Sequence, residues 1–245
     1  MKPGKTLLLS ACVVLAALVP VRSAVLAAVP TARDSDNYDR LLAIIHTGSE
    51  ENKKTAKDAL KAMGEVGIVL LKTDCKDIES PRGTLAWSLL KELVTDQEVL
   101  REFARKNLID SAKSWKGTYG AAKTAKSSRQ QTLQQIVGDY VDLLIASGNP
   151  RDFDLLLKAL AYSLIVSDQK LDYGKDFETW QKIWTLLGEK VKASDSAQQL
   201  EEWQKTIDGH FRTQSLLRNY VDRKTIQAYH TASLVLMQRL NELKK

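Results

Sequence analysis

Apolar residues recur every three or four positions along most of the chain after residue 36. Residues at i, i+3, i+4 and i+7 share one face of an α-helix, so this spacing predicts amphipathic helices. No stretch of comparable length alternates apolar and polar residues with a period of two. We therefore predict an all-α protein of stacked antiparallel helical hairpins. The clearest stripes are Tyr38–Leu41–Leu42–Ile45, Leu133–Ile136–Val137–Tyr140–Val141–Leu144, Phe177–Trp180–Trp184–Leu187–Val191 and Tyr229–Ala232–Leu236–Leu240–Leu243.

Glycine, proline and small polar residues mark where these helices begin and end. Gly64 follows one stripe, as expected of a residue just past a helix C-terminus. Pro81 and Pro150 stand at predicted first helical positions, where the missing N–H of proline costs nothing. Ser194 or Asp195 is expected to cap the helix that carries Leu200, Trp203, Ile207 and Phe211.

A small, polar and basic stretch separates two groups of predicted helices. Its glycines, serines and lysines favour a loop. We therefore expect a helical subdomain at residues 28–115, a basic flexible linker at 116–128 and a helical-bundle subdomain at 129–245. Residues 153–165 are apolar nearly all round, so this helix is expected to be the most buried of the second group.

The first 27 residues have the organisation of a cleavable secretory signal. Lys2 and Lys5 precede an apolar run from Leu7 to Val19, and small residues lead to Ala27. The apolar run is about thirteen residues long, whereas roughly 20 are needed to span a bilayer. We therefore expect export to the periplasm or the medium, with cleavage after Ala27. An uncleaved anchor is the alternative.

The two cysteines bear on anchoring and on disulfides. Cys12 ends Leu9-Ser10-Ala11-Cys12, which has the residue types of a lipoprotein signal, so lipid anchoring is a second alternative. Its position argues against this, because only residues 7–9 would form the apolar core of that signal. Without the leader, Cys75 stands alone and no intramolecular disulfide is available. We expect a buried and unreactive Cys75 thiol, since no histidine lies near it in sequence.

Charge is nearly balanced once the leader is removed. The whole chain has 36 basic and 30 acidic residues, a net charge of +6. The leader holds three of the basic residues and no acidic one, so 33 basic residues remain against 30 acidic ones. Such a mixture is typical of a solvated globular surface. It argues against a specific nucleic-acid binder.

One segment nevertheless concentrates positive charge. Residues 101–129 hold eight basic and two acidic residues. We expect this segment to contact a protein partner, or an anionic lipid surface or polymer, by charge with aromatic support. A solvated loop is the alternative. The candidate partner-binding residues are Lys113, Trp115, Lys116, Tyr119, Lys123, Lys126 and Arg129.

The five tryptophans divide into two groups. Trp180, Trp184 and Trp203 lie on apolar helical stripes, so we expect them in the core. Trp87 and Trp115 stand among polar neighbours and are open candidates for a ligand or partner contact. Trp115 is the better candidate, because it lies within the basic segment.

Part of the chain matches itself after a shift of thirty residues. Ala56 then falls on Ala86, and Leu60 falls on Leu90. The motif Ala-x-x-Ala-Leu-x-x-Met-Gly at 56–64 resembles the first helix of HEAT-like repeats. Ser80-Pro81-Arg82 resembles the start of such a repeat, and the resemblance covers about residues 37–109. Similarity to exported HEAT-like proteins implies a scaffold that binds a partner.

No motif predicts reaction chemistry. His46, His210 and His230 show no metal-ligand spacing. The acidic groups near Asp34 and Asp172 lack the glycine and distal glutamate of a calcium loop, so we interpret them as helix caps. No Gly-x-Ser-x-Gly motif is present. We therefore predict no catalytic residue, no metal site and no cofactor.

These observations favour a non-catalytic, exported helical scaffold that binds a protein partner in the cell envelope. One alternative is an envelope enzyme acting on a cell-wall or anionic polymer, which requires a cleft with a carboxyl group of raised pKa. The other is a carrier of lipids or apolar ligands, which requires a cavity near residues such as Trp184 and Leu157. The last helix, with Leu234 to Met237 all apolar, either closes the domain or exposes a patch for self-association.

Overall fold

The computed structural model describes residues 29–118, 128–162, 174–215 and 223–245. These ranges form α-helices and two short 3₁₀ turns without any strand, which confirms the all-α prediction. The predicted signal lies outside the described residues. The elements are α1 (Ala32–Thr47), α2 (Glu50–Ala62), α3 (Gly64–Asp74), η1 (Cys75–Asp77), α4 (Pro81–Leu93), α5 (Gln97–Thr118), α6 (Ser128–Ser147), α7 (Pro150–Ala159), η2 (Leu160–Tyr162), α8 (Gly174–Ala193), α9 (Ala197–Ser215) and α10 (Arg223–Leu243).

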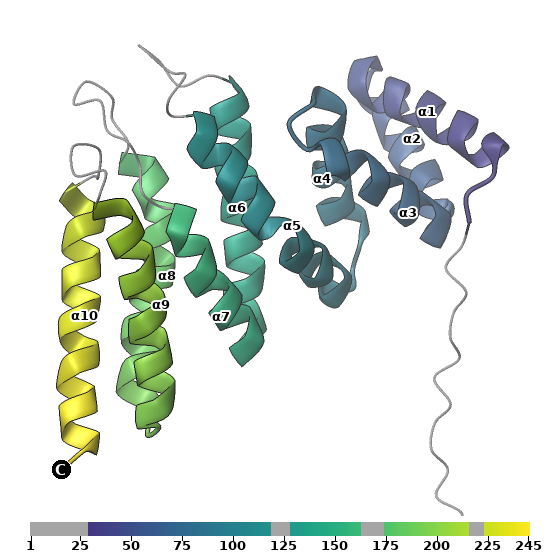
Figure 1. The fold of residues 1–245 in the computed structure, drawn as a ribbon. Coiled ribbons are helices and arrows are strands. Elements are labelled where there is room, and N and C mark those ends of the chain that lie inside the picture. The colour runs from purple at the N-terminus through teal and green to yellow at the C-terminus, as the bar shows by residue number, and fades with distance from the viewer. Residues whose placement is uncertain (1–28, 119–127, 163–173, 216–222) are drawn as a thin grey trace, which may run out of the picture.

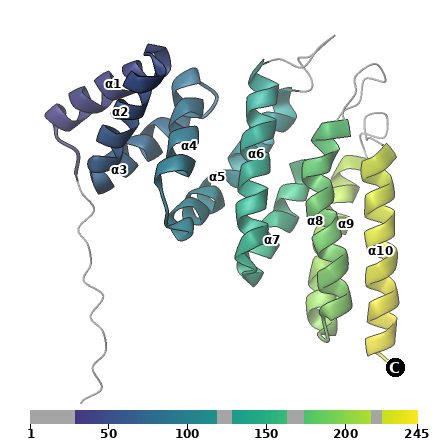
Figure 2. The same cartoon turned by 180° about the vertical axis from the view of Figure 1, so that it is seen from behind.

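The helices stack side by side into an elongated body (Figure 1). Several consecutive helices pack as hairpins, including α1 with α2, α3 with α4 and α9 with α10, and α5 and α6 pack most extensively. From α5 onward there are two layers, because α5, α7 and α9 contact one another in order, as do α6, α8 and α10. Figure 2 looks onto the layer of α6, α8 and α10. This arrangement is compatible with a helical repeat. None of the described helices has the length and apolarity that a membrane crossing requires.

The thirty-residue shift relates α2 to α4. Corresponding alanines and leucines are buried in both helices: Ala56 with Ala86, and Leu60 with Leu90. The two helices are also linked at the surface, where Lys57 Nζ lies 2.7 Å from Glu92 Oε2. The internal match in the sequence therefore corresponds to a repeated packing position.

Predicted caps define several helix ends. The Ser80 hydroxyl accepts a hydrogen bond from the Gly83 N–H at 3.0 Å, and Pro81 occupies the first position of α4. Gly64 follows α2 with a φ of 58°, in the left-handed region that favours glycine. At α1, Asp34 completes a capping box with Thr31, as expected for a carboxylate near a helix start.

The start of α9 differs from the prediction that Ser194 or Asp195 caps it. The hydroxyl of Ser196, directly before α9, accepts a hydrogen bond from the Gln199 N–H at 3.3 Å. Ser194 instead completes the last turn of α8, because its N–H donates to the Lys190 carbonyl at 2.9 Å. The prediction placed the cap one or two residues too early.

The predicted apolar helix over residues 153–165 is also different. It ends at Ala159, where η2 follows, and residues 163–165 lie outside the described chain. Asp154 and Lys158 are exposed, whereas Leu156 is buried. Helix α7 is therefore amphipathic. The apolar residues after Ala159, which were expected to extend the helix, lie in η2 or outside the described residues.

The apolar core continues from one half of the stack to the other. Trp87 of α4 stacks on Phe103 of α5 at 5.6 Å and meets Tyr140 of α6 edge-on at 4.9 Å between ring centroids. Further along, Trp115 of α5 stacks on Trp180 of α8 at 5.2 Å. Aromatic contacts of this kind add to the area buried by each ring. The α5–α6 hairpin is thus shared by both halves.

The predicted linker at residues 116–128 lies mostly outside the described residues. Residues 116–118 continue α5, and Ser128 begins α6. On either side of the linker, the described residues are the end of α5 and the start of α6, and these two helices pack closely on each other. The division into subdomains at 28–115 and 129–245 stays a prediction.

Helix α10 packs through one side only. Leu236 is completely buried, whereas Leu234 and Met237 are 53% and 49% exposed. The helix therefore covers the end of the core and also leaves two large apolar side chains on the surface. Self-association through them stays a prediction.

Gly83 offers a test of the packing between η1 and α4. An added Cβ would lie 2.0 Å from the Asp77 carbonyl oxygen, too close for any side chain. We expect Gly83→Ala to lower the free energy of unfolding by about 3 kcal/mol, measured in urea. The control is Gly188→Ala, whose Cβ meets no atom within 4 Å. It should stabilise α8 by about 1 kcal/mol. Equal midpoints for the two variants would contradict the close approach.

Candidate functional site

The predicted basic surface is partly described. Lys113 is exposed, and the exposed Arg129 forms an ion pair with Glu79. Lys116 is half-buried, and its ammonium donates to the Ala161 carbonyl at 3.4 Å. Burial lowers the pKa of Lys116. Of the described candidates, Lys113 is therefore the residue that presents its charge most openly. The other predicted basic and aromatic candidates lie outside the described residues: Tyr119, Lys123 and Lys126.

Trp115 differs from the surface contact residue that we expected. Its side chain is 1% exposed and stacks on Trp180 inside the core. The reason is that α5 continues past residue 115, so Trp115 extends the buried stripe of Leu108 and Ala112. The spacing i, i+4 and i+7 of these three residues indicates a shared buried helix face, but the polar residues next to Trp115 in the sequence had suggested a surface position.

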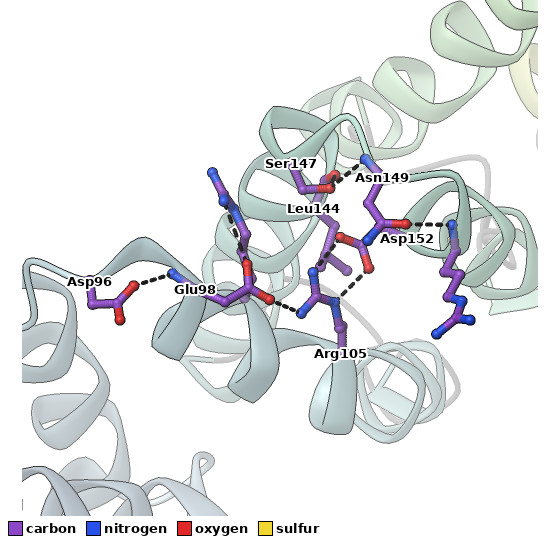
Figure 3. Close-up of polar contacts among 9 residues, drawn as sticks. Asp96, Glu98, Arg105, Leu144, Ser147, Asn149 and Asp152 are labelled. Atoms are coloured by element: carbon purple, nitrogen blue, oxygen red, sulfur yellow. Dashed lines mark hydrogen bonds and ion pairs between the residues drawn. The ribbon is translucent and has the colours of Figure 1, made fainter. Parts of the chain in front are cut away.

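A partly buried ion pair, between the half-buried Arg105 and the buried Asp152, joins α5 to α7 (Figure 3). Arg105 Nε and Nη2 donate to the two oxygens of Asp152 at 2.6 and 2.8 Å, and Nη1 bonds to Glu98. Asp152 is 1% exposed. The guanidinium, by donating to this carboxylate, holds the pKa of Asp152 below its ordinary value. A bidentate pair of this kind fixes the angle between two helices. Its role here is structural.

This pair leads to a prediction about acid stability. At neutral pH, Asp152→Asn should lower the free energy of unfolding by about 2 kcal/mol, because the half-buried Arg105 loses its bidentate carboxylate partner and keeps only Glu98. The folded-state pKa of Asp152 is lowered, so its contribution is present above about pH 4 and is lost as the pH falls through the folded pKa. The difference between wild type and variant in urea should therefore shrink at low pH.

Asp154→Asn is the matched control for that experiment. Asp154 lies on the same helix but is exposed, so its substitution should change stability by less than about 0.5 kcal/mol at either pH. A difference between wild type and Asp152→Asn that stays constant from pH 7 to pH 3 would contradict the assignment.

Two grooves run along α8, one between α8 and α10 and one between α6 and α8. Figure 2 shows these three helices side by side. The α8–α10 groove has a volume of about 400 Å³ and the α6–α8 groove about 480 Å³. Both are open to solvent on one side. Gln181 and Thr185 of α8 line both grooves, so these two residues form the ridge between them. We name the surface made of the two grooves and this ridge the α8 face.

The α8–α10 groove is mainly apolar. Among the described residues, Lys224 is the one charged residue that lines it, and the polar Gln227 and Thr231 line it as well. Small residues leave its space open, since an added Cβ on Gly188 meets no atom within 4 Å. The apolar lining consists chiefly of Phe177, Trp184, Leu187, Val191, Ala232 and Val235.

The α6–α8 groove is acidic. Asp142 on α6 is engaged by Lys182 of α8, whose ammonium lies 2.6 and 2.8 Å from the two carboxylate oxygens. Glu178 and Glu189 line the same groove and are exposed. After Lys182 compensates Asp142, two negative charges remain. The α8 face therefore combines an apolar groove with an acidic one.

The sequence suggested Trp184 as a residue lining a ligand cavity, but the two grooves and the ridge between them were not predicted. Trp184 was expected in the core with Trp180 and Trp203. Trp180 and Trp203 are buried, but Trp184 is only partly buried and borders the open groove. The groove arises because Gly188 lies beside it without a side chain. That small residue on α8 was the available signal.

Other candidate chemistry is limited in the described ranges. No group of three or more His, Cys, Asp or Glu side chains is placed there to hold a metal ion. Cys75 is buried with a free thiol, and burial raises its pKa to about 12. The described carboxyls with shifted pKa values, Asp34, Glu50 and Asp152, are all shifted downward. These three groups therefore lack the raised pKa of a proton donor.

Comparisons with known proteins add no relative. A scan against protein-family models, a search of curated proteins and a search of solved structures each found no match to this chain.

Proposed function

We propose that the chain is an exported, HEAT-like helical scaffold that binds a protein partner in the cell envelope through its α8 face. The observation that carries this proposal is the pair of grooves on either side of the ridge at Gln181 and Thr185. The stacked hairpins and the repeat of α2 in α4 support the HEAT-like assignment. The charged, apolar and small-residue segments before Ala28 support export.

The chemistry of the α8 face suits a protein partner. Protein interfaces combine a desolvated apolar centre with a polar rim. The α8–α10 groove offers Trp184 and Val235 for the centre, and the ridge and the acidic groove supply a polar border. Because both grooves are open, a surface of the partner has access to them at the same time. A few well-packed anchors dominate the energy of such contacts.

The two alternatives fit the described residues less well. An enzyme that hydrolyses such a polymer by acid catalysis needs a carboxyl of raised pKa in a cleft, whereas the pKa values of Asp34, Glu50 and Asp152 are lowered. A carrier of apolar ligands is favoured by Trp184 in the α8–α10 groove, but that groove is open and Leu157 does not line it. Binding of an anionic surface through residues 101–129 stays a prediction.

Filling the apolar groove tests the proposed function. Gly188→Leu places a side chain where the groove is open, without a clash at its Cβ. The matched control is Gly209→Leu on α9, where an added Cβ also meets no atom within 4 Å. Both variants should fold, since leucine favours helix over glycine.

The measurement is crosslinking of the immobilised protein in native envelope extract, followed by mass spectrometry. We expect a partner captured by wild type and by Gly209→Leu at equal yield, with at least about a tenfold loss for Gly188→Leu. Equal capture by all three proteins would place the binding surface elsewhere. Absence of any specific partner would remove the proposal.

Export has its own test. In a bacterial host the full chain should appear in the periplasmic or secreted fraction with Ala28 as its first residue, measured by intact mass. Ala27→Phe should block this cleavage, because signal peptidase requires a small residue before the cut. A mature chain that starts at a lipidated Cys12, or one that keeps Met1 and a membrane association, would contradict cleavage after Ala27.

A further inference from the structure

The α8 face also indicates the chemistry of the segment that it binds, and this inference rests on the proposed function. We propose that the partner contributes an amphipathic helix that lies along α8. Its apolar side fills the α8–α10 groove, and two basic side chains about three turns apart pair with Glu178 and Glu189.

The direction of this helix follows from the shape of the grooves. The α8–α10 groove is lined from Phe177 to Val191, and the α6–α8 groove from Glu178 to Glu189. Both therefore follow the same three to four turns of α8. Helices pack by placing the ridge of one into the groove of another, so a straight groove between parallel helices suits a further helix. The residues that line the two grooves supply such a surface over this length of α8.

The apolar half of the recognition lies between α8 and α10. Leu187 is completely buried and Ala232 nearly so, and they belong to the inner part of the groove. Trp184 and Val235 are partly buried and border it. A volume of about 400 Å³ has room for more than one aliphatic side chain. Successive apolar residues on one face of a partner helix therefore fit into the groove together.

The second part of the recognition is electrostatic and involves Glu178 and Glu189. Glu178 and Glu189 are eleven residues apart on one continuous helix, which corresponds to about 16 Å at 1.5 Å per residue. Eleven residues are close to three whole turns, so both carboxylates project on the same side of α8. Lys182, the cation between them, is held by Asp142. A partner helix with basic residues at the same spacing therefore matches both carboxylates.

Synthetic peptides test this inference. The first probe is an 18-residue fluorescent helix with leucines at i, i+3, i+4 and i+7 and two lysines eleven residues apart. The second probe has glutamates in place of those lysines. Fluorescence anisotropy should show at least about tenfold tighter binding of the lysine peptide to the wild-type protein, weakening as salt is raised.

Charge reversal on the protein provides the decisive comparison. The double variant Glu178→Lys and Glu189→Lys should reverse the preference, so that the glutamate peptide binds more tightly. The control double variant is Glu51→Lys and Glu65→Lys, which makes the same change in net charge at two exposed residues of α2 and α3. It should keep the wild-type preference. Gly188→Leu should weaken both peptides.

The outcomes separate this inference from the proposed function. Equal binding of the two peptides to wild type, no binding of either, or equal shifts in the two double variants would overturn the basic amphipathic helix. If capture of a native partner still depends on Gly188, the scaffold function stands without it. If that capture is also insensitive to Gly188→Leu, both proposals fail.

Discussion

The fold depends on contacts that the α5–α6 hairpin makes on both of its sides. Toward the N-terminal half, Asp139 of α6 accepts hydrogen bonds from the Trp87 indole N–H at 2.8 Å and from Lys91 at 2.5 Å. Toward the C-terminal half, Arg105 of α5 holds the buried Asp152 of α7. In a linear stack each layer is stabilised by its neighbours, so a joint in the middle determines whether the two halves form one body.

Ion pairs of similar form connect successive even-numbered helices. Each joins a lysine on one of the two helices to a carboxylate on the other, and exposed pairs of this kind contribute little stability individually. Their effect is on geometry, because each pair favours one lateral offset between two helices. The α8 face lies at the last of these connections. The pairs are Lys57–Glu92 between α2 and α4, Lys91–Asp139 between α4 and α6, and Lys182–Asp142 between α6 and α8.

Much of the helical architecture was predictable, because burial of one side of a helix leaves a period in its sequence. That period identified Leu133 and Tyr140, which are fully buried. Trp115 was misplaced because its sequence neighbours were given more weight than its helical neighbours. Sequence-local reasoning also missed Arg105 and Asp152, which are 47 positions apart. No local pattern indicates which distant carboxylate an arginine meets.

The candidate site was not predictable for a different reason. A groove is a space between packed helices, whereas the sequence indicates only which residues share one face of a helix. Gly188 and Ala232 become meaningful once α8 and α10 lie side by side. The HEAT-like resemblance implied a binding surface but did not indicate which layer carries it. That choice depends on where the packed side chains leave room.

The elongated stack also has a consequence for dynamics. Helix α1 lies at one end of the body and packs its buried stripe of Tyr38, Leu41, Leu42 and Ile45 on α2 and α3, so it has neighbours toward the middle of the stack only. Its Tyr38 hydroxyl also donates to Asp74 at 2.7 Å. Helix α5 contacts α4 through Phe103 on one side, and it packs on α6 and α7 on the other. Local opening requires only the loss of nearby contacts, so amide protons at the end of such a stack exchange through small fluctuations. Those of the central hairpin exchange only when most of the molecule opens. Protection should therefore rise from the end of the body toward its middle.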